Sequence, residues 1–139
     1  QDVQHSHAVV ARMQYAHRAT VLKGEYTAPQ LLSFMGHFQF CIGMRLHFLI
    51  FSALQGIPFV ALPYASKVAG FLQDLDMPMS PLREVTTGGL IAHIDRAWDT
   101  QGEIRERIAR RLPELQERAR QTNRIVLRVL SEAHVPASA

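Results

Sequence analysis

The sequence is poor in the residues that disordered chains and fibrous proteins require. Only eight of its 139 residues are glycine and seven are proline, while 47% are hydrophobic and 19% are charged. This composition excludes intrinsic disorder and collagen-like or low-complexity fibres. A chain of 139 residues has about the length of one ordinary domain and is too short for a two-domain enzyme. We therefore expect a folded domain with a single core.

Long apolar runs and cysteine pairs are also missing. The longest apolar run, Phe48 to Leu54, is interrupted by Ser52 and is far shorter than the roughly 20 residues of a membrane-spanning helix. No basic-then-apolar signal peptide opens the chain. The single cysteine, Cys41, excludes an internal disulfide, and no zinc-ligand spacing is present. The sequence thus predicts a cytoplasmic location, with the inner face of the membrane as an option, no transmembrane segment, and neither a metal nor a cofactor site.

The net charge of +3 comes entirely from the C-terminal part of the chain. Residues 1–100 carry seven basic and seven acidic side chains, whereas residues 101–139 carry eight arginines and five glutamates. Three Glu–Arg pairs there are four residues apart, which is typical of a solvated helix face: Glu103–Arg107, Glu106–Arg110 and Glu114–Arg118. Apolar residues step mostly by four and three, a heptad-like seam: Ile104, Ile108, Leu112, Leu115, Ala119, Thr122, Val126, Val129 and Ala133. Because Pro113 lies inside the seam, we expect two helical pieces or a kink.

The remaining sequence alternates between helical and strand patterns. Helices are predicted over residues 2–17, from the cap Thr27 through Met35, over 44–54 with Gly56 as the terminating residue, from Ser66 to about Leu75, and over 88–99. Short apolar runs predict strands over residues 18–23, 39–42 and 57–62. Three strands separated by helices indicate an α/β fold with a parallel sheet and right-handed crossovers.

Parallel strands all end at one edge of the sheet, and open α/β sheets bind ligands at that edge. Three loops follow the predicted strands: Lys23–Thr27, Gly43–His47 and Pro63–Lys67. Neighbouring strands are about 5 Å apart, so Arg45, His47 and Lys67 are placed to face one small ligand.

The two cations Arg45 and Lys67 are expected at helix N-termini, which favour anions by roughly 0.3–1 kcal/mol. A bound phosphate or carboxylate would resolve this conflict, and the pattern therefore predicts an anion site. Three alternatives stay open. Arg45 could pair with Asp74 or Asp76, His47 could be a core histidine among apolar neighbours, and Lys67 could simply be solvated.

Two blocks carry a resemblance to a known family. Gly43-Met-Arg-Leu-His47 precedes an apolar helix, and Gly56-Ile-Pro-Phe-Val-Ala-Leu-Pro-Tyr64 is followed by Lys67-Val68. At this spacing they resemble the C-terminal part of the polysaccharide pyruvyl transferase family, in its bacterial cell-wall polymer and exopolysaccharide branch. Phe48 departs from the pattern, since a small residue usually follows the histidine in the family.

The resemblance implies the C-terminal half of a two-domain fold like that of the B-type glycosyltransferases. Residues 1–100 would form a Rossmann-like donor-binding domain with helices on both faces of its sheet, and residues 101–135 a helical extension packing on this domain or on the missing N-terminal half. Because the chain starts at Gln1 and matches one half only, we expect a fragment that is inactive alone.

The implied reaction moves the pyruvyl group of phosphoenolpyruvate onto two hydroxyls of a sugar, on a free or lipid-linked saccharide, and releases phosphate. His47 and Lys67 match donor-site positions, with Arg45 in the same block, and His47 suits an acid/base role or a phosphate contact. Gly43, Tyr64 and Ser66 are further candidate contacts. Two other functions compete: the donor half of a nucleotide-sugar glycosyltransferase of the same fold, and a non-enzymatic module that binds nucleic acid or acidic membrane through its arginine-rich end.

Overall fold

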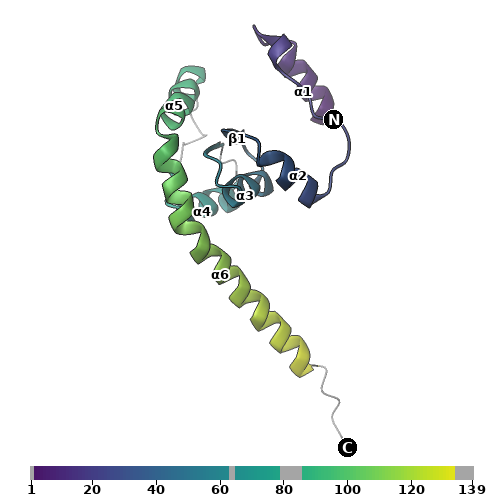
Figure 1. Cartoon of the computed structure of the whole chain (residues 1–139), viewed down its shortest axis with the longest axis vertical. Coiled ribbons are helices and arrows are strands. Elements are labelled where there is room, and N and C mark those ends of the chain that lie inside the picture. Colours follow the sequence, from purple (N-terminus) through teal and green to yellow (C-terminus); the bar gives the residue numbers. More distant parts are fainter. Residues whose placement is uncertain (1, 63–64, 79–85, 134–139) are drawn as a thin grey trace, which may run out of the picture. The chain divides into compact units, whose positions relative to one another are not determined.

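The structure is a computed structural model and describes residues 2–62, 65–78 and 86–133 (Figure 1). The chain divides into two compact units, Gln1–Leu31 and Leu32–Ala139. Each unit is described by itself below.

The first unit contains helix α1 (Asp2–Val10) and one short 3-10 helix, η1 (Ala16–Arg18). The predicted helix over 2–17 is therefore too long, and the predicted strand over 18–23 is wrong, because residues 19–27 lie in no helix or strand. Leu22 is 46% exposed, which shows why the pattern misled. An apolar run forms a strand only where a partner strand and a core cover it.

Helix α2 (Ala28–Met35) begins at the end of the first unit and continues into the second. Thr27 starts it as predicted. The Gln30 amide N–H donates to Thr27 Oγ1 at 3.4 Å, and the Thr27 amide N–H donates to Gln30 Oε1 at 2.9 Å. The two residues thus form a reciprocal capping box that satisfies two backbone donors at the helix start.

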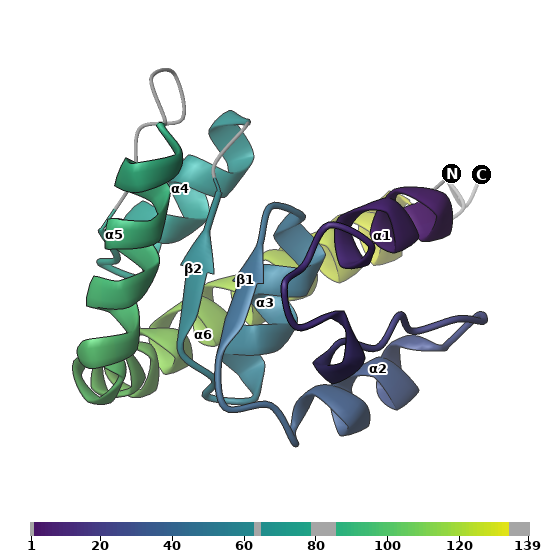
Figure 2. The ribbon, with the colours of Figure 1, turned by 90° about the horizontal axis from the view of Figure 1, so that it is seen from above.

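The second unit is built on a two-stranded parallel sheet. Strand β1 (Cys41–Gly43) pairs with β2 (Phe59–Ala61) in the register Cys41↔Phe59 and Gly43↔Ala61. Helix α3 (Leu46–Leu54) connects the two strands, and α4 (Ser66–Asp74) follows β2 (Figure 2). The predicted mixed α/β class and the parallel pairing of these two strands are confirmed, whereas the expected third strand over 18–23 is not part of the sheet.

Helices α3 and α4 end in the same way, by a left-handed residue. Gly56 has φ +64° after α3, as predicted, and Asp76 has φ +56° after α4. Two backbone hydrogen bonds close the last turn of each helix. At α3 the N–H groups of Gly56 and Ile57 donate to the carbonyls of Ala53 and Ser52, respectively. At α4 the N–H groups of Asp76 and Met77 donate to the carbonyls of Gln73 and Leu72. Glycine takes this conformation without steric cost, whereas an aspartate at this place is uncommon.

The core lies between the sheet and the helices. Its largest fully buried side chains come from β2, α3, α4 and the first half of the C-terminal helix: Phe59, Leu49, Leu72, Leu75, Ile108 and Val68. Burial of each large aliphatic or aromatic side chain contributes about 1.5–3 kcal/mol relative to exposure. Burial of these side chains fixes α3 and α4 against the sheet. It thereby also fixes the positions at which both helices start.

Helix α5 (Thr87–Asp99) leads into α6 (Gln101–Ala133), a single assigned helix of 33 residues. Of the two alternatives predicted at Pro113, that of two separate pieces is wrong, because α6 continues through this residue, while a kink there stays a prediction. The seam is covered only in its first part. Ile104 and Ile108 are buried and Leu112 and Leu115 half-buried, while Val126 and Val129, on the same face farther along, are more than half exposed.

The three α6 arginines with predicted glutamate partners, Arg107, Arg110 and Arg118, instead contact the C-terminal end of α4 and the turn after it. Arg107 donates a hydrogen bond to the backbone carbonyl of Asp76, and Arg111 donates one to the backbone carbonyl of Asp74. The side-chain carboxylates of Asp76 and Asp74 lie within 4.0 Å of Arg110 and Arg118, respectively. The three i,i+4 pairs predicted along α6 do not occur among the ion pairs of the described residues. The C-terminal end of α4 presents carbonyls and a negative dipole end, which attract guanidinium groups.

Candidate functional site

The carboxyl ends of β1 and β2 lie side by side. Gly43 and Ala61 are the last register pair, and the Leu62 N–H donates to the Gly43 carbonyl at 2.8 Å. Helix α3 starts at Leu46 and α4 at Ser66, so both helices begin close after these strand ends. We call this region, Gly43–His47 with Ala65–Lys67, the strand-end site. The loop Lys23–Thr27 follows no strand and belongs to the first unit, so the expected set of three loops after strands is wrong.

Neither helix at the strand-end site has a side-chain cap. Arg45 is the N-cap residue of α3 and Ala65 that of α4, and neither accepts a hydrogen bond from the first turn. By contrast, α2 has its capping box, and at α5 the Thr86 side chain accepts from the Gly89 N–H at 3.1 Å. Backbone N–H groups in the first turns of α3 and α4 therefore have no side-chain acceptor within the described residues.

Three basic residues stand at these two helix starts. Arg45 occupies the N-cap of α3, His47 is its second residue, and Lys67 is the second residue of α4. All three are exposed, and none has an ion pair among residues 2–62, 65–78 and 86–133. Free backbone donors and positive side chains at one edge make an arrangement suited to an anion.

The structure decides two of the alternatives. Asp74 pairs with Arg118 and Asp76 lies near Arg110, so neither carboxylate serves Arg45. His47 is exposed, and a core role for it is wrong. Lys67 is exposed, as either of its interpretations requires.

The other candidate contacts differ in what the structure says of them. Ser66 is exposed as the first residue of α4, not its cap. Tyr64 lies outside the described residues. Gly43 is half-buried beneath the ring of Phe48, and a Cβ atom at this position would overlap the ring carbons. Phe48, which departs from the family pattern, thus packs the start of α3 against the end of β1.

The cysteine of β1, Cys41, is not activated as a nucleophile. Cys41 is 3% exposed, and burial raises the pKa of its thiol, an effect that a hydrogen bond with Ser52 partly offsets. A thiol is a nucleophile only as thiolate, so Cys41 is a packing residue. No group of three metal-ligating side chains occurs within the part of the chain that the structure describes.

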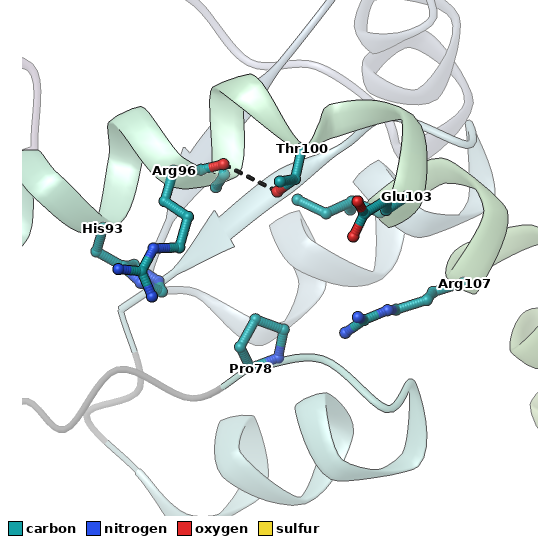
Figure 3. A pocket seen from close by; sticks show the side chains of 8 residues that line it. Pro78, His93, Arg96, Thr100, Glu103 and Arg107 are labelled. Carbon is teal, nitrogen blue, oxygen red and sulfur yellow. Dashed lines mark hydrogen bonds between the residues drawn. The ribbon is translucent and has the colours of Figure 1, made fainter.

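A second concave region lies between α5 and α6. This α5–α6 pocket has a volume of about 350 Å³ and is lined by Pro78, His93, Arg96, Ala97, Thr100, Glu103, Ile104 and Arg107 (Figure 3). His93 and Arg96 of this lining are not among the site residues predicted from the sequence. Their spacing of three residues on one helix is the signal that places both on one face.

The chain is similar to known proteins over part of its length. Residues 2–66 match the family model of polysaccharide pyruvyl transferases, and the match includes Arg45 and His47 and stops one residue before Lys67. The amylovoran biosynthesis protein AmsJ of Erwinia amylovora is 29% identical over 100 residues, which are 70% of this chain but 24% of that protein. The chain therefore spans about a quarter of the length of this curated relative.

Two negative findings complete the comparison. No solved structure matches this chain. Among the described residues, no helix combines the length and the apolar character needed to cross a membrane. The sequence resemblance itself is confirmed: residues 2–66 are similar to the polysaccharide pyruvyl transferase family, and the Erwinia protein is a relative involved, by its name, in amylovoran biosynthesis.

Proposed function

We propose that this chain is the donor-binding part of an enzyme that transfers the pyruvyl group of phosphoenolpyruvate to a sugar of an exopolysaccharide or cell-wall polymer. One observation carries the proposal: two uncapped helix starts bring Arg45, His47 and Lys67 to one edge of a parallel sheet. The family match supports the reaction class, and the name of the Erwinia protein supports a polysaccharide product.

The donor carries a phosphate and a carboxylate. An arginine can hold a carboxylate or phosphate with two parallel hydrogen bonds, and a lysine supplies a compact charge. We assign these tasks to Arg45 and Lys67, with the free N–H groups of α3 and α4 as further donors. Gly43, Ser66 and Tyr64 are the secondary contacts of the same proposal.

The reaction joins two sugar hydroxyls to the central carbon of the pyruvyl group and breaks the bond from that carbon to the phosphate oxygen. One hydroxyl proton is matched by the proton that converts the methylene to a methyl group, and the other leaves with inorganic phosphate. Histidine titrates near neutral pH, so His47 suits this proton transfer. If His47 instead only contacts the phosphate, replacement by Gln will preserve the pH profile of turnover while weakening donor binding.

The proposal includes a second half of the enzyme. Residues 1–100 form the Rossmann-like donor domain and residues 101–135 the extension, in a two-domain arrangement like that of the B-type glycosyltransferases. The uncovered seam at Val126 and Val129 supports a contact of α6 with the other half. A groove of about 490 Å³ between α3, α4 and α6 adjoins the point where the seam leaves the core. The 139-residue chain alone is then inactive, and the whole enzyme works in the cytoplasm.

Calorimetric titration of phosphoenolpyruvate tests this assignment in the chain joined to its N-terminal half. We expect His47→Ala and Lys67→Ala each to weaken donor binding at least tenfold in proteins with unchanged circular dichroism. Lys23→Ala is the matched control, since Lys23 is an exposed lysine of the first unit, and it should bind as the parent does. Unchanged affinity in both site variants would refute the proposal. Thermal protection by a nucleotide-sugar and not by phosphoenolpyruvate would favour the glycosyltransferase alternative.

The arginine-rich end is a weaker basis for function. Five arginines of α6 form ion pairs with carboxylates of α4, of the turn after α4 or of α6 itself, namely Arg110, Arg111, Arg118, Arg120 and Arg124. Arginines occupied in this way are less available to phosphates of nucleic acid. Duplex DNA binding with a steep dependence on salt would reverse this conclusion.

A further inference from the structure

The α5–α6 pocket is separate from the strand-end site. Pro78 of its lining follows the C-terminal end of α4, whereas the strand-end site lies at the N-terminal end of the same helix. At 1.5 Å per residue, the nine residues of α4 span about 13 Å between these ends. A ligand in one place is therefore not a ligand in the other.

The pocket gathers positive charge. His93 and Arg96 lie close together on the α5 side, and Glu103 and Arg107 lie on the α6 side, with Pro78 facing them (Figure 3). Within residues 2–62, 65–78 and 86–133, none of these four side chains forms an ion pair within 4.0 Å. Two guanidinium groups and an imidazole thus share the space with a single carboxylate.

Backbone contacts fix two parts of the lining. Arg107 donates through Nη1 to the Asp76 carbonyl at 3.1 Å, which anchors its guanidinium beside the end of α4. Thr100 donates through Oγ1 to the Arg96 carbonyl at 2.8 Å and so fixes the last turn of α5 (Figure 3). Ala97 and Ile104 are 8% and 5% exposed and give the pocket an apolar floor.

We infer that the α5–α6 pocket binds a small organic phosphate, with its phosphate at Arg96 on the α5 side and its apolar part on Ala97, Ile104 and Pro78. Guanidinium groups bind phosphate oxygens with paired hydrogen bonds. The volume of about 350 Å³ is within the range of small-molecule sites. This site is additional to the strand-end site and does not depend on the proposed transferase reaction.

The test uses the 139-residue chain with Arg45→Gln and Lys67→Gln, so that the strand-end site takes no phosphate. Phenyl phosphate serves as the probe in calorimetric titration, and inorganic phosphate is compared with it. We expect saturable binding of phenyl phosphate and at least tenfold weaker binding of inorganic phosphate, which lacks the apolar part. Adding Arg96→Gln should weaken phenyl phosphate binding at least tenfold. Arg96 is exposed, so this replacement leaves the core intact.

Arg128→Gln is the matched control, because Arg128 is an exposed arginine near the far end of α6 and removes the same charge. It should leave the affinity unchanged. Absence of saturable binding, or equal losses for Arg96→Gln and Arg128→Gln, would overturn the inference. Binding seen in the parent chain and abolished by Arg45→Gln and Lys67→Gln would assign phosphate to the strand-end site alone, which overturns this inference but supports the proposed function.

Discussion

Helices α2 and α5 begin differently from α3 and α4. The first two satisfy their backbone donors with threonine and glutamine side chains, and a side-chain cap contributes typically about 1 kcal/mol. The other two lack such caps and carry basic side chains where the helix dipole disfavours them. The starts of α3 and α4, which lie at the strand ends, therefore contribute less stability than capped starts would. Such a loss is expected where a bound ligand supplies the missing interactions.

The largest expected effect concerns the packing that holds the start of α3. Gly43→Ala places a methyl group in overlap with the Cδ1 and Cε1 edge of the Phe48 ring, so we expect a loss of about 1–3 kcal/mol in the free energy of unfolding, measured by urea denaturation. In a Phe48→Leu background the same replacement should cost clearly less, because the flexible side chain can move away. An equal cost in both backgrounds would show that the ring contact does not fix α3.

Removing a cap should have the next largest effect. Thr86→Ala leaves the Gly89 N–H without its acceptor, and we expect a loss of about 1 kcal/mol in chemical denaturation. Thr87→Ala is the matched control, since Thr87 is the exposed first residue of α5 and caps nothing in the structure. If both variants lose the same stability, side-chain capping does not distinguish α5 from α3 and α4.

Supplying a cap to α3 should have the opposite sign. Arg45→Asp places a carboxylate at the N-cap, and we expect a gain of about 0.5–1 kcal/mol in stability together with loss of phosphoenolpyruvate binding. Arg45→Gln should lose affinity without that gain. Retained donor binding in Arg45→Asp would show that the uncapped start of α3 serves no anion.

Adding a side-chain cap to α4 tests the effect of capping on stability without changing the charge of the site. Ala65→Ser provides a hydroxyl acceptor at the N-cap and removes no basic side chain, so thermal unfolding should occur a few degrees higher, by about 0.5–1 kcal/mol in free energy. Ala65→Val provides no acceptor and is the control. A serine variant no more stable than the valine variant would show that these N–H groups are already satisfied.

The smallest effect is expected from Cys41. This residue is buried in β1, whereas Arg45 and His47 at the start of α3 are exposed. Its pKa is raised in the folded state by burial, so folding favours the neutral thiol. Its contribution to stability is therefore present below the ordinary thiol pKa of about 8.5 and is lost as the pH rises above it. Urea unfolding at several alkaline pH values should show a shallower decline for Cys41→Ala, and parallel declines would contradict this.

The sequence predicted those elements whose boundaries depend on local chemistry. Thr27 and Gly56 marked a helix start and a helix end correctly, because a cap and a left-handed turn are properties of a few neighbouring residues. The strand over 18–23 failed because strand formation depends on a partner that a local pattern does not contain. The parallel β1–β2 pairing was also predicted, and a helix was predicted over 44–54, whereas α3 begins at Leu46, so Arg45 lies at the N-cap of α3 rather than inside it.

Other features required the folded chain. The sequence indicated no contact between Gly43 and Phe48, since it depends on the angle at which α3 leaves β1. Three arginines of α6 were predicted to pair with glutamates on their own helix, but Arg110 and Arg118 meet carboxylates of the α4 C-terminus and the turn after it, more than 30 residues away. The α5–α6 pocket joins three segments that no local pattern connects.

The uncovered part of α6 has a practical consequence for handling the protein. Five aliphatic residues within six positions are at least half exposed: Ile125, Val126, Leu127, Val129 and Leu130. Apolar surface of this kind associates in concentrated solution unless a partner covers it. A chain purified alone should therefore lose solubility as it is concentrated, and glutamine at Ile125 and Leu127 should extend the usable concentration without altering the strand ends, where the chemistry is proposed to occur.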